Sequence, residues 1–140
     1  LAQTKLLDGS GYRKFKEVIT AQGGNAQVLD RFDLLPNATG MREIVTTRGG
    51  YVSAIDAEGI GKAVVMIGGG RNAVDDTIDH AVGIILEVKV GSKVDAGAVL
   101  CRLYHTSENN LEEAAEIVED SFKISNNAPE QREIVLEVVG

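Results

Sequence analysis

The sequence predicts an α+β domain with a mostly antiparallel, strongly curved sheet and flanking helices. Apolar residues recur at spacings of three and four in some segments and of two in others, which indicates helices and strands respectively. These segments follow one another through short connections, without the strand–helix–strand rhythm of a parallel sheet. The 140 residues also include 16 glycines but only 2 prolines. That ratio is typical of tight turns between short elements.

The first predicted element is a helix from Ser10 to Gln22. Its apolar residues between Tyr12 and Ile19 fall on one face at spacings of three and four. Either Asp8 or Ser10 is expected to cap the N-terminus by accepting a backbone N–H bond. Gly23 then supplies the left-handed residue that commonly ends a helix.

A shorter helical stretch is predicted after this glycine. Asn25 is expected to cap it, with Ala26, Leu29 and Phe32 pointing inward. Pro36 ends the stretch because proline cannot continue a helix. Residues 1–40 are therefore expected to be a helical connection, followed by a second domain over residues 41–140.

The period changes to two at Arg42, where β-branched residues predict a strand. A second strand is predicted from Tyr51 to Ile55, after a glycine turn. The segment from Ala57 to Ile67 fits either a helix or a buried strand. We favour the helix because the segment is eleven residues long and Asp56 is a good cap.

The last third of the chain predicts four more elements. Two strands are expected over Val82–Val90 and Ala98–Tyr104, joined by a turn containing glycines. A helix begins at Asn110, with Glu113 as the partner in a capping box and a buried stripe of Leu111, Ala114, Val118 and Phe122. Residues 132–139 are expected to form a terminal strand.

Composition excludes several classes of function. Apolar residues make up 44% of the chain and charged residues 25%, a balance typical of a globular domain and not of a disordered one. The formal net charge of −7 and the lack of clustered Lys or Arg argue against nucleic-acid and anionic-membrane partners. No apolar run is long enough to span a membrane. The single cysteine, Cys101, fits a reducing compartment.

The most conspicuous motif is Gly68-Gly69-Gly70-Arg71. It fits a loose dinucleotide-binding fingerprint, but the residues after it lack the apolar stripe of the helix that such a site requires. The simplest interpretation is a glycine turn that ends the preceding helix. A ligand-binding interpretation stays open, because glycines allow a close backbone approach and Arg71 offers a bidentate fork to phosphate or carbonyl oxygens.

Other polar residues give weaker signals. Asp75, Asp76, Asp79 and His80 include oxygen ligands that suit magnesium or calcium, but a solvated turn explains them better. Next to Tyr104, His105 has no serine or cysteine nucleophile motif nearby. Cys101, inside an apolar strand, is expected to behave as a small hydrophobe.

The segment from Val88 to Leu100 resembles the half-repeat of barrel-sandwich carrier modules that hold biotin or lipoate. Such modules present one lysine at an exposed hairpin tip. Here we expect Lys89 inside a strand and Lys93 in the wrong turn. The resemblance therefore implies a related architecture without the carrier lysine.

A second resemblance covers nearly the whole chain. The segments DGSGYRKFKEVITAQGG at 8–24, LLPNA at 34–38, GGYVSAIDAEGIGKAVVMIGGGR at 49–71, DTIDHAVGIILEVKVGSKVDAG at 76–97 and ENNLEEAAEIVEDSFKISNNAPE at 108–130 carry it. In this order they resemble the C-terminal part of pyrimidine-nucleoside phosphorylases, including thymidine phosphorylase. The combination is specific, whereas each segment alone would be weak.

The resemblance implies a homodimeric cytoplasmic enzyme of pyrimidine salvage, a glycosyltransferase. Such an enzyme cleaves thymidine, uridine or deoxyuridine with inorganic phosphate as co-substrate, and it releases the base and a pentose 1-phosphate. Its helical domain and its α/β domain close on a cleft. The family's C-terminal region is of the α/β-hammerhead type, related to barrel-sandwich folds, which would account for the carrier-like turn.

The family's phosphate-binding and pyrimidine-binding residues lie in its N-terminal two-thirds. Since this chain begins at Leu1, we expect a C-terminal fragment that is inactive alone, contains no cofactor or metal, and works with the N-terminal catalytic part. The resemblance places the loop Gly68, Gly69, Gly70 and Arg71 near the mouth of the cleft, where it would help to cover the nucleoside. Two alternatives stay open: a non-catalytic barrel-sandwich binding or interaction module, and a structural domain whose loop has no ligand role.

Overall fold

The computed structural model describes residues 2–71 and 73–130 of the chain. It divides into two compact units, one up to Asn37 and the other from Ala38 onward. The terminal strand expected over residues 132–139 lies outside the described residues. Within the described ranges, no helix combines the length and the apolar character that crossing a bilayer requires.

The first unit is helical. It contains α1 (Ala2–Leu7), α2 (Ser10–Ala21) and two short 3₁₀ helices, η1 (Ala26–Leu29) and η2 (Phe32–Leu34). The predicted helix from Ser10 is confirmed and ends one residue early.

The N-cap residue of α2 is Gly9, which neither prediction named, but the Asp8 side chain still accepts from the first residue of the helix, and the C-terminus ends as expected. Oδ1 of Asp8 accepts a hydrogen bond from the backbone N of Ser10 at 2.8 Å, and Gly23 has a φ of 80°. The side chain of Asn25 likewise caps η1, since its Oδ1 accepts from the backbone N of Gln27 at 3.0 Å.

One expectation for this unit is wrong. Phe32 was expected to point inward, but it is 70% exposed. The helical elements of this unit contain no buried residue, so η2 has no core against which an aromatic ring could pack.

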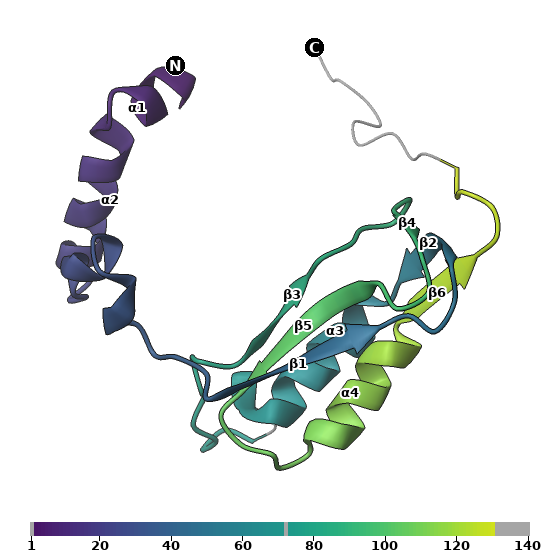
Figure 1. Cartoon of the computed structure of the whole chain (residues 1–140). Helices are drawn as coiled ribbons and strands as arrows, with labels where there is room; N and C mark the ends of the chain where they lie inside the picture. Colours follow the sequence, from purple (N-terminus) through teal and green to yellow (C-terminus); the bar gives the residue numbers. More distant parts are fainter. Residues whose placement is uncertain (1, 72, 131–140) are drawn as a thin grey trace. The chain divides into compact units, whose positions relative to one another are not determined.

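The second unit is built on two antiparallel sheets of three strands each (Figure 1). In the first sheet, β5 (Val99–His105) lies between β1 (Gly40–Val45) and β3 (Gly83–Leu86). In the second, β2 (Gly50–Ile55) lies between β4 (Lys93–Val94) and β6 (Phe122–Ser125). The predicted α+β class with antiparallel strands is confirmed, and the sheets are open.

Two strand predictions need correction. The strand expected over Val82–Val90 ends at Leu86, and β4 and β6 were not predicted. Both unpredicted strands are four residues or shorter, and β4 pairs with β2 through two residues only. Strands this short are defined by their neighbours and leave little periodicity in the sequence.

The helix predicted from Ala57 is confirmed, and the buried-strand alternative is wrong. Helix α3 covers Ala57–Val64 and continues as the π-helical turn η3 (Val65–Gly69). The side chain of Asp56 caps α3, with Oδ1 accepting from the backbone N of Glu58 at 3.0 Å. Gly68 then leaves the helical conformation with a φ of 99°.

Helix α4 (Leu111–Asp120) begins where predicted, but not with the predicted capping box. Its first residue is preceded by Asn110 in the left-handed conformation, with a φ of 59° and no side-chain bond to the helix. Nδ2 of Asn110 instead donates to the backbone O of Met66 at 3.4 Å. A tertiary contact with η3 has replaced the local cap, so Glu113 has no capping role here.

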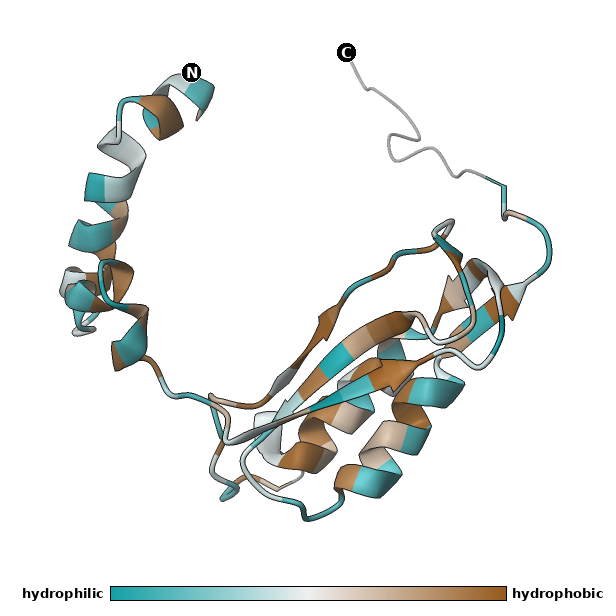
Figure 2. Cartoon of the chain, in the orientation of Figure 1, coloured by the Kyte–Doolittle hydropathy of each residue, from teal (hydrophilic) through white to brown (hydrophobic). Residues whose placement is uncertain are grey.

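The core of this unit lies between the first sheet and the two helices, which lie together on one side of it (Figure 1). Three residues of the predicted stripe, Leu111, Ala114 and Val118, form the buried face of α4. Phe122 is buried as predicted, but it begins β6 and does not belong to the helix. Figure 2 shows apolar and hydrophilic residues alternating around α4, as one buried face and one solvated face require. Burial of each large apolar side chain contributes about 1.5–3 kcal/mol, so this helix is held mainly by its apolar face.

Candidate functional site

The four residues of the predicted loop lie at the end of η3. The non-helical φ of 99° at Gly68 turns the chain away from the helix, and Gly70 is extended. The backbone N of Asp79 donates to the backbone O of Gly68 at 2.8 Å. After Arg71 the chain therefore returns to Gly68, and this hydrogen bond closes the base of the loop. We call this base, where Gly68 meets Asp79, the root of the loop.

The glycines of this loop have a packing role that the sequence did not reveal. A Cβ on Gly69 would lie 2.6 Å from Cγ1 of Val64, and one on Gly70 would lie 2.6 Å from Cγ2 of Val65. Both positions thus require glycine because the loop folds back closely on its own helix. This close approach fixes where the next residue, Arg71, leaves the fold.

Arg71 is exposed and lies beside a cavity of about 810 Å³. The cavity lies between the α3–η3 helix and the start of α4, and its lining combines polar and apolar side chains: Gly61, Lys62, Val65, Met66, Arg71, Asn110, Glu113 and Ile117. Arg71 is thus placed at a concave surface.

The two cations of the cavity differ in their partners. Lys62 pairs with Glu58 one turn earlier at 2.7 Å, and this carboxylate raises the pKa of Lys62. Arg71 makes no hydrogen bond or ion pair with any other residue in the ranges 2–71 and 73–130. Its guanidinium is therefore the cation at this surface that remains available for an external oxygen ligand.

The dinucleotide-binding interpretation fails on the structure. Such a site needs a helix whose N-terminus follows the glycines and faces the pyrophosphate. From Ala73 to Val82 the chain forms turns and irregular segments. The next regular element is the strand β3.

The acidic residues after the loop act as hydrogen-bond acceptors for nearby groups. Oδ2 of Asp76 accepts from the backbone N of Ala73 at 2.8 Å, and Oδ1 of Asp79 accepts from the backbone N of Ala81 at 2.9 Å. No group of three or more His, Cys, Asp or Glu residues in the described part of the chain is arranged to hold a metal ion.

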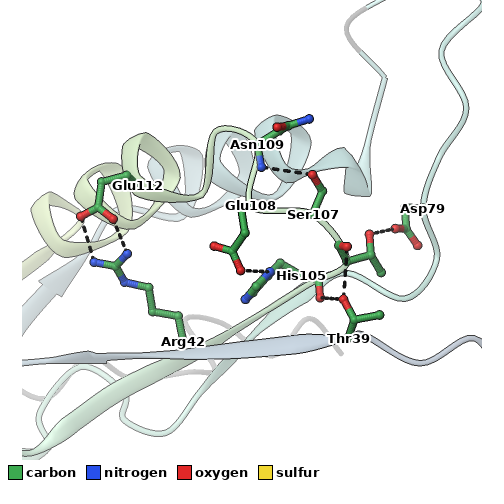
Figure 3. Close-up of polar contacts among 9 residues, drawn as sticks. Thr39, Arg42, Asp79, His105, Ser107, Glu108, Asn109 and Glu112 are labelled. Carbon is green, nitrogen blue, oxygen red and sulfur yellow. Dashed lines mark hydrogen bonds and ion pairs between the residues drawn. The ribbon is translucent and has the colours of Figure 1, made fainter.

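His105 lies at the end of β5 and is buried (Figure 3). Its Nδ1 is 3.8 Å from Oε1 of Glu108 and has no hydrogen-bond partner among the described residues. Gly40 on β1 lies directly against the imidazole, since a Cβ there would be 2.4 Å from Cε1 of the ring. This enclosure makes His105 part of the packing at the end of the sheet.

Cys101 and the two candidate carrier lysines do not join the site. Cys101 is fully buried, and this burial raises the pKa of its thiol to about 11, so it is not a nucleophile at neutral pH. Lys89 was expected inside a strand, but it begins the turn closed by the Ser92 N to Lys89 O bond of 2.9 Å. Lys93 was expected in a turn and lies in β4.

Sequence reasoning missed two residues that hold the loop in place, Thr106 and Asn110. The hydroxyl of Thr106 donates to Oδ2 of Asp79, and the amide of Asn110 donates to the backbone O of Met66. These contacts join positions 27 and 44 residues apart in the chain. No local pattern in the sequence could have found them.

A comparison with protein families gives a match over more than half of the chain. The model of the pyrimidine nucleoside phosphorylase C-terminal domain matches residues 51–125. This range runs from β2 to β6 and includes the loop Gly68–Arg71 together with its contacts at Asp79, Thr106 and Asn110.

Proposed function

The chain belongs to the family of pyrimidine nucleoside phosphorylase C-terminal domains, and we propose that it is the C-terminal domain of a glycosyltransferase that uses phosphate to cleave nucleosides. The reaction transfers the pentose of a pyrimidine nucleoside, such as thymidine or uridine, to inorganic phosphate. Its products are the free base and a pentose 1-phosphate. The enzyme works as a cytoplasmic homodimer and needs no cofactor in this domain.

The loop Gly68–Arg71 is the part of this domain that meets the substrate cleft. The observation that carries this assignment is the guanidinium of Arg71, which is exposed, lines a cavity and has no partner among the described residues. A guanidinium in this state can form two parallel hydrogen bonds to a phosphate or to a pyrimidine carbonyl. The reacting groups come from the N-terminal catalytic part of the enzyme.

Covering the cleft favours phosphorolysis over hydrolysis. Water and phosphate compete for the same anomeric carbon once the glycosidic bond weakens. A loop that closes over the bound nucleoside removes bulk water and strengthens the electrostatic interactions inside the cleft. A domain that closes the cleft needs no reactive side chain of its own, which is consistent with the burial of Cys101 and His105.

The test uses a complete phosphorylase that carries this domain. We expect Arg71→Ala to lower kcat/KM for nucleoside phosphorolysis by about 10- to 100-fold, the loss of one charge-assisted bidentate contact. Arg71→Lys should recover only part of the loss, because an ammonium lacks the planar fork. Arg13→Ala is the matched control, since Arg13 is an exposed arginine far along the sequence from the loop.

Two results would contradict the proposal. Unchanged kcat and KM in Arg71→Ala would show that the loop is a structural turn with no role in substrate binding. Release of thymine or uracil by the 140-residue chain alone, in the presence of phosphate, would show that the domain contains reacting groups of its own.

A further inference from the structure

We propose that Asp79 is a positioning residue that fixes the root of the loop Gly68–Arg71 by tying it to the connection between β5 and α4. Its effect on turnover rests on the function proposed above for that loop, whereas its effect on the loop's order does not. The proposal follows from three hydrogen bonds that meet at this one residue.

Three polar atoms of Asp79 each have a separate partner. Its backbone N donates to the backbone O of Gly68 at 2.8 Å, which closes the loop. Its Oδ1 accepts from the backbone N of Ala81 at 2.9 Å. Its Oδ2 accepts from the hydroxyl of Thr106, the residue that follows β5 in the sequence.

The connection between β5 and α4, which contains Thr106, is itself hydrogen-bonded to the start of β1, as Figure 3 shows. The backbone N of Thr39, just before β1, donates to the backbone O of His105 at 3.0 Å. The hydroxyl of Thr39 lies 3.2 Å from the backbone O of Thr106 and donates to it. On the helix side, Oγ of Ser107 accepts from the backbone N of Asn109 at 3.1 Å. Thr106 is therefore held through Thr39, and the segment that follows it is closed by the bond between Ser107 and Asn109.

A second contact from the same connection reaches the other side of the loop's root. Nδ2 of Asn110 donates to the backbone O of Met66, two residues before Gly68. The segment that leads into Arg71 is thus held by Asn110 through Met66 and by Asp79 through Gly68. Both contacts lead to one short segment, residues 105–110, which is hydrogen-bonded to Thr39 just before β1.

An aspartate suits this role because it is ionised at neutral pH. The Thr106 hydroxyl and the Ala81 N–H both donate to the carboxylate, and together they lower the pKa of Asp79. A hydrogen bond to an ionised acceptor is roughly twice as strong as a neutral one. The consequence for Arg71 is preorganisation: its backbone starts from a fixed point, so less conformational entropy is lost when its side chain meets a ligand.

The first arm of the test measures loop order on the chain itself by amide hydrogen exchange. We expect Thr106→Val to speed exchange across residues 68–81 by about tenfold, the loss of its hydrogen bond to Asp79, while β5 stays protected. Asp79→Ala should have at least this effect, because it also removes the hydrogen bond from Ala81. Thr106→Ser keeps the hydroxyl and should exchange like the parent. Asp75→Ala removes an equal charge from the same connection between η3 and β3, at an exposed residue without a partner among those described, and should change nothing.

The second arm measures phosphorolysis in a complete enzyme carrying the same substitutions. We expect Asp79→Ala and Thr106→Val to lower kcat/KM by about tenfold each. The double variant should be no worse than Asp79→Ala alone, because that change already removes the hydrogen bond that Thr106→Val removes. Thr106→Ser and Asp75→Ala should retain full activity.

The two arms of the test distinguish the anchoring role of Asp79 from the function proposed for the loop. Faster exchange with unchanged kcat/KM would support the anchoring role of Asp79 and contradict the function proposed for the loop. Unchanged exchange in both Asp79→Ala and Thr106→Val would overturn the anchoring role. Equal effects of Asp75→Ala and Asp79→Ala would also overturn it, since charge alone would then explain the loss.

Discussion

Gly59 of α3 lies directly against Ser121 at the end of α4. A Cβ on Gly59 would stand 2.4 Å from Oγ of Ser121 and 3.1 Å from Oδ2 of Asp56. Gly59 is buried, and the Ser121 hydroxyl donates to the backbone O of Ile117 at 2.7 Å. The two helices of the core therefore approach each other through the missing side chain of one glycine.

We expect Gly59→Ala to destabilise the chain by about 1–3 kcal/mol, because the new methyl group must displace the Ser121 hydroxyl from its hydrogen bond. Gly61→Ala is the matched control, since nothing lies within 4 Å of its added Cβ. That control should gain up to about 1 kcal/mol, the ordinary preference for alanine in a helix. Urea unfolding midpoints measure both changes.

The double variant Gly59→Ala with Ser121→Ala gives the decisive comparison. Removing the hydroxyl removes the clash, so this variant should be more stable than the sum of the two single changes predicts. Additive losses would show that the approach of α3 and α4 does not depend on this contact.

Gly40 of β1 is a second glycine at which an added Cβ would collide with a neighbouring side chain. A Cβ there would lie 2.4 Å from Cε1 and 2.5 Å from Nε2 of His105, so Gly40→Ala must push the buried imidazole aside. We expect a loss of about 1–3 kcal/mol in the free energy of unfolding. Gly83→Ala serves as the control, because Gly83 also pairs with β5 and has nothing within 4 Å of an added Cβ. Thermal unfolding of both variants checks the difference, and equal losses would count against the packing role of Gly40.

Cys101 should be inert in the folded chain. It is fully buried on β5, and burial raises the pKa of its thiol to about 11. The reactive species is the thiolate, so a thiol reagent at pH 7.5 should label Cys101 only after unfolding. Labelling rates measured with increasing urea should follow the unfolding transition. Rapid labelling in the absence of urea would contradict the placement of Cys101 in the core.

Acid should weaken the second unit through two carboxylates whose pKa is lowered in the folded chain. The ion pair with Arg42 lowers the pKa of Glu112 from 4.5, and the hydrogen bond from Thr106 lowers that of Asp79 from 3.8. Their contribution to stability is fully present above these ordinary values and is lost as pH falls through the lowered ones. The urea midpoint should therefore fall between pH 5 and pH 3.

The variant Glu112→Gln tests the origin of this dependence. Removing the carboxylate that pairs with Arg42 should reduce the fall of the urea midpoint between pH 5 and pH 3. Glu116→Gln, a change at another exposed residue of α4, should leave the fall intact. An identical pH dependence in both variants would mean that the Arg42–Glu112 pair contributes nothing to it.

The elements predicted from the sequence are those with a local physical cause. Periodicity defines α2, α3 and α4, a capping side chain also defines the start of α3, and each helix begins within one residue of the predicted position. The strands β1 and β2 follow from a period of two that includes β-branched residues, and β5 lies one residue later than the predicted strand Ala98–Tyr104. The family was also visible in the sequence, because its segments occur in a fixed order, and the match over residues 51–125 confirms it.

The elements and contacts that the sequence did not predict have their causes elsewhere in the chain. The strands β4 and β6 exist because β2 offers both of its edges, and neither strand has a periodicity of its own. Asn110 looks like a helix cap in the sequence, but its amide goes to Met66 because the fold brings η3 beside the start of α4.

The loop Gly68–Arg71 shows the division most clearly. The sequence alone determined that three glycines end a helix and that an arginine follows them. Only the tertiary structure decided that Asp79 and Thr106 close the root of this loop, and that Arg71 stands unpaired among the described residues, beside a cavity. The physical reason is distance along the chain: turn chemistry acts over a few residues, whereas a hydrogen bond across 27 residues exists only once the sheet has formed.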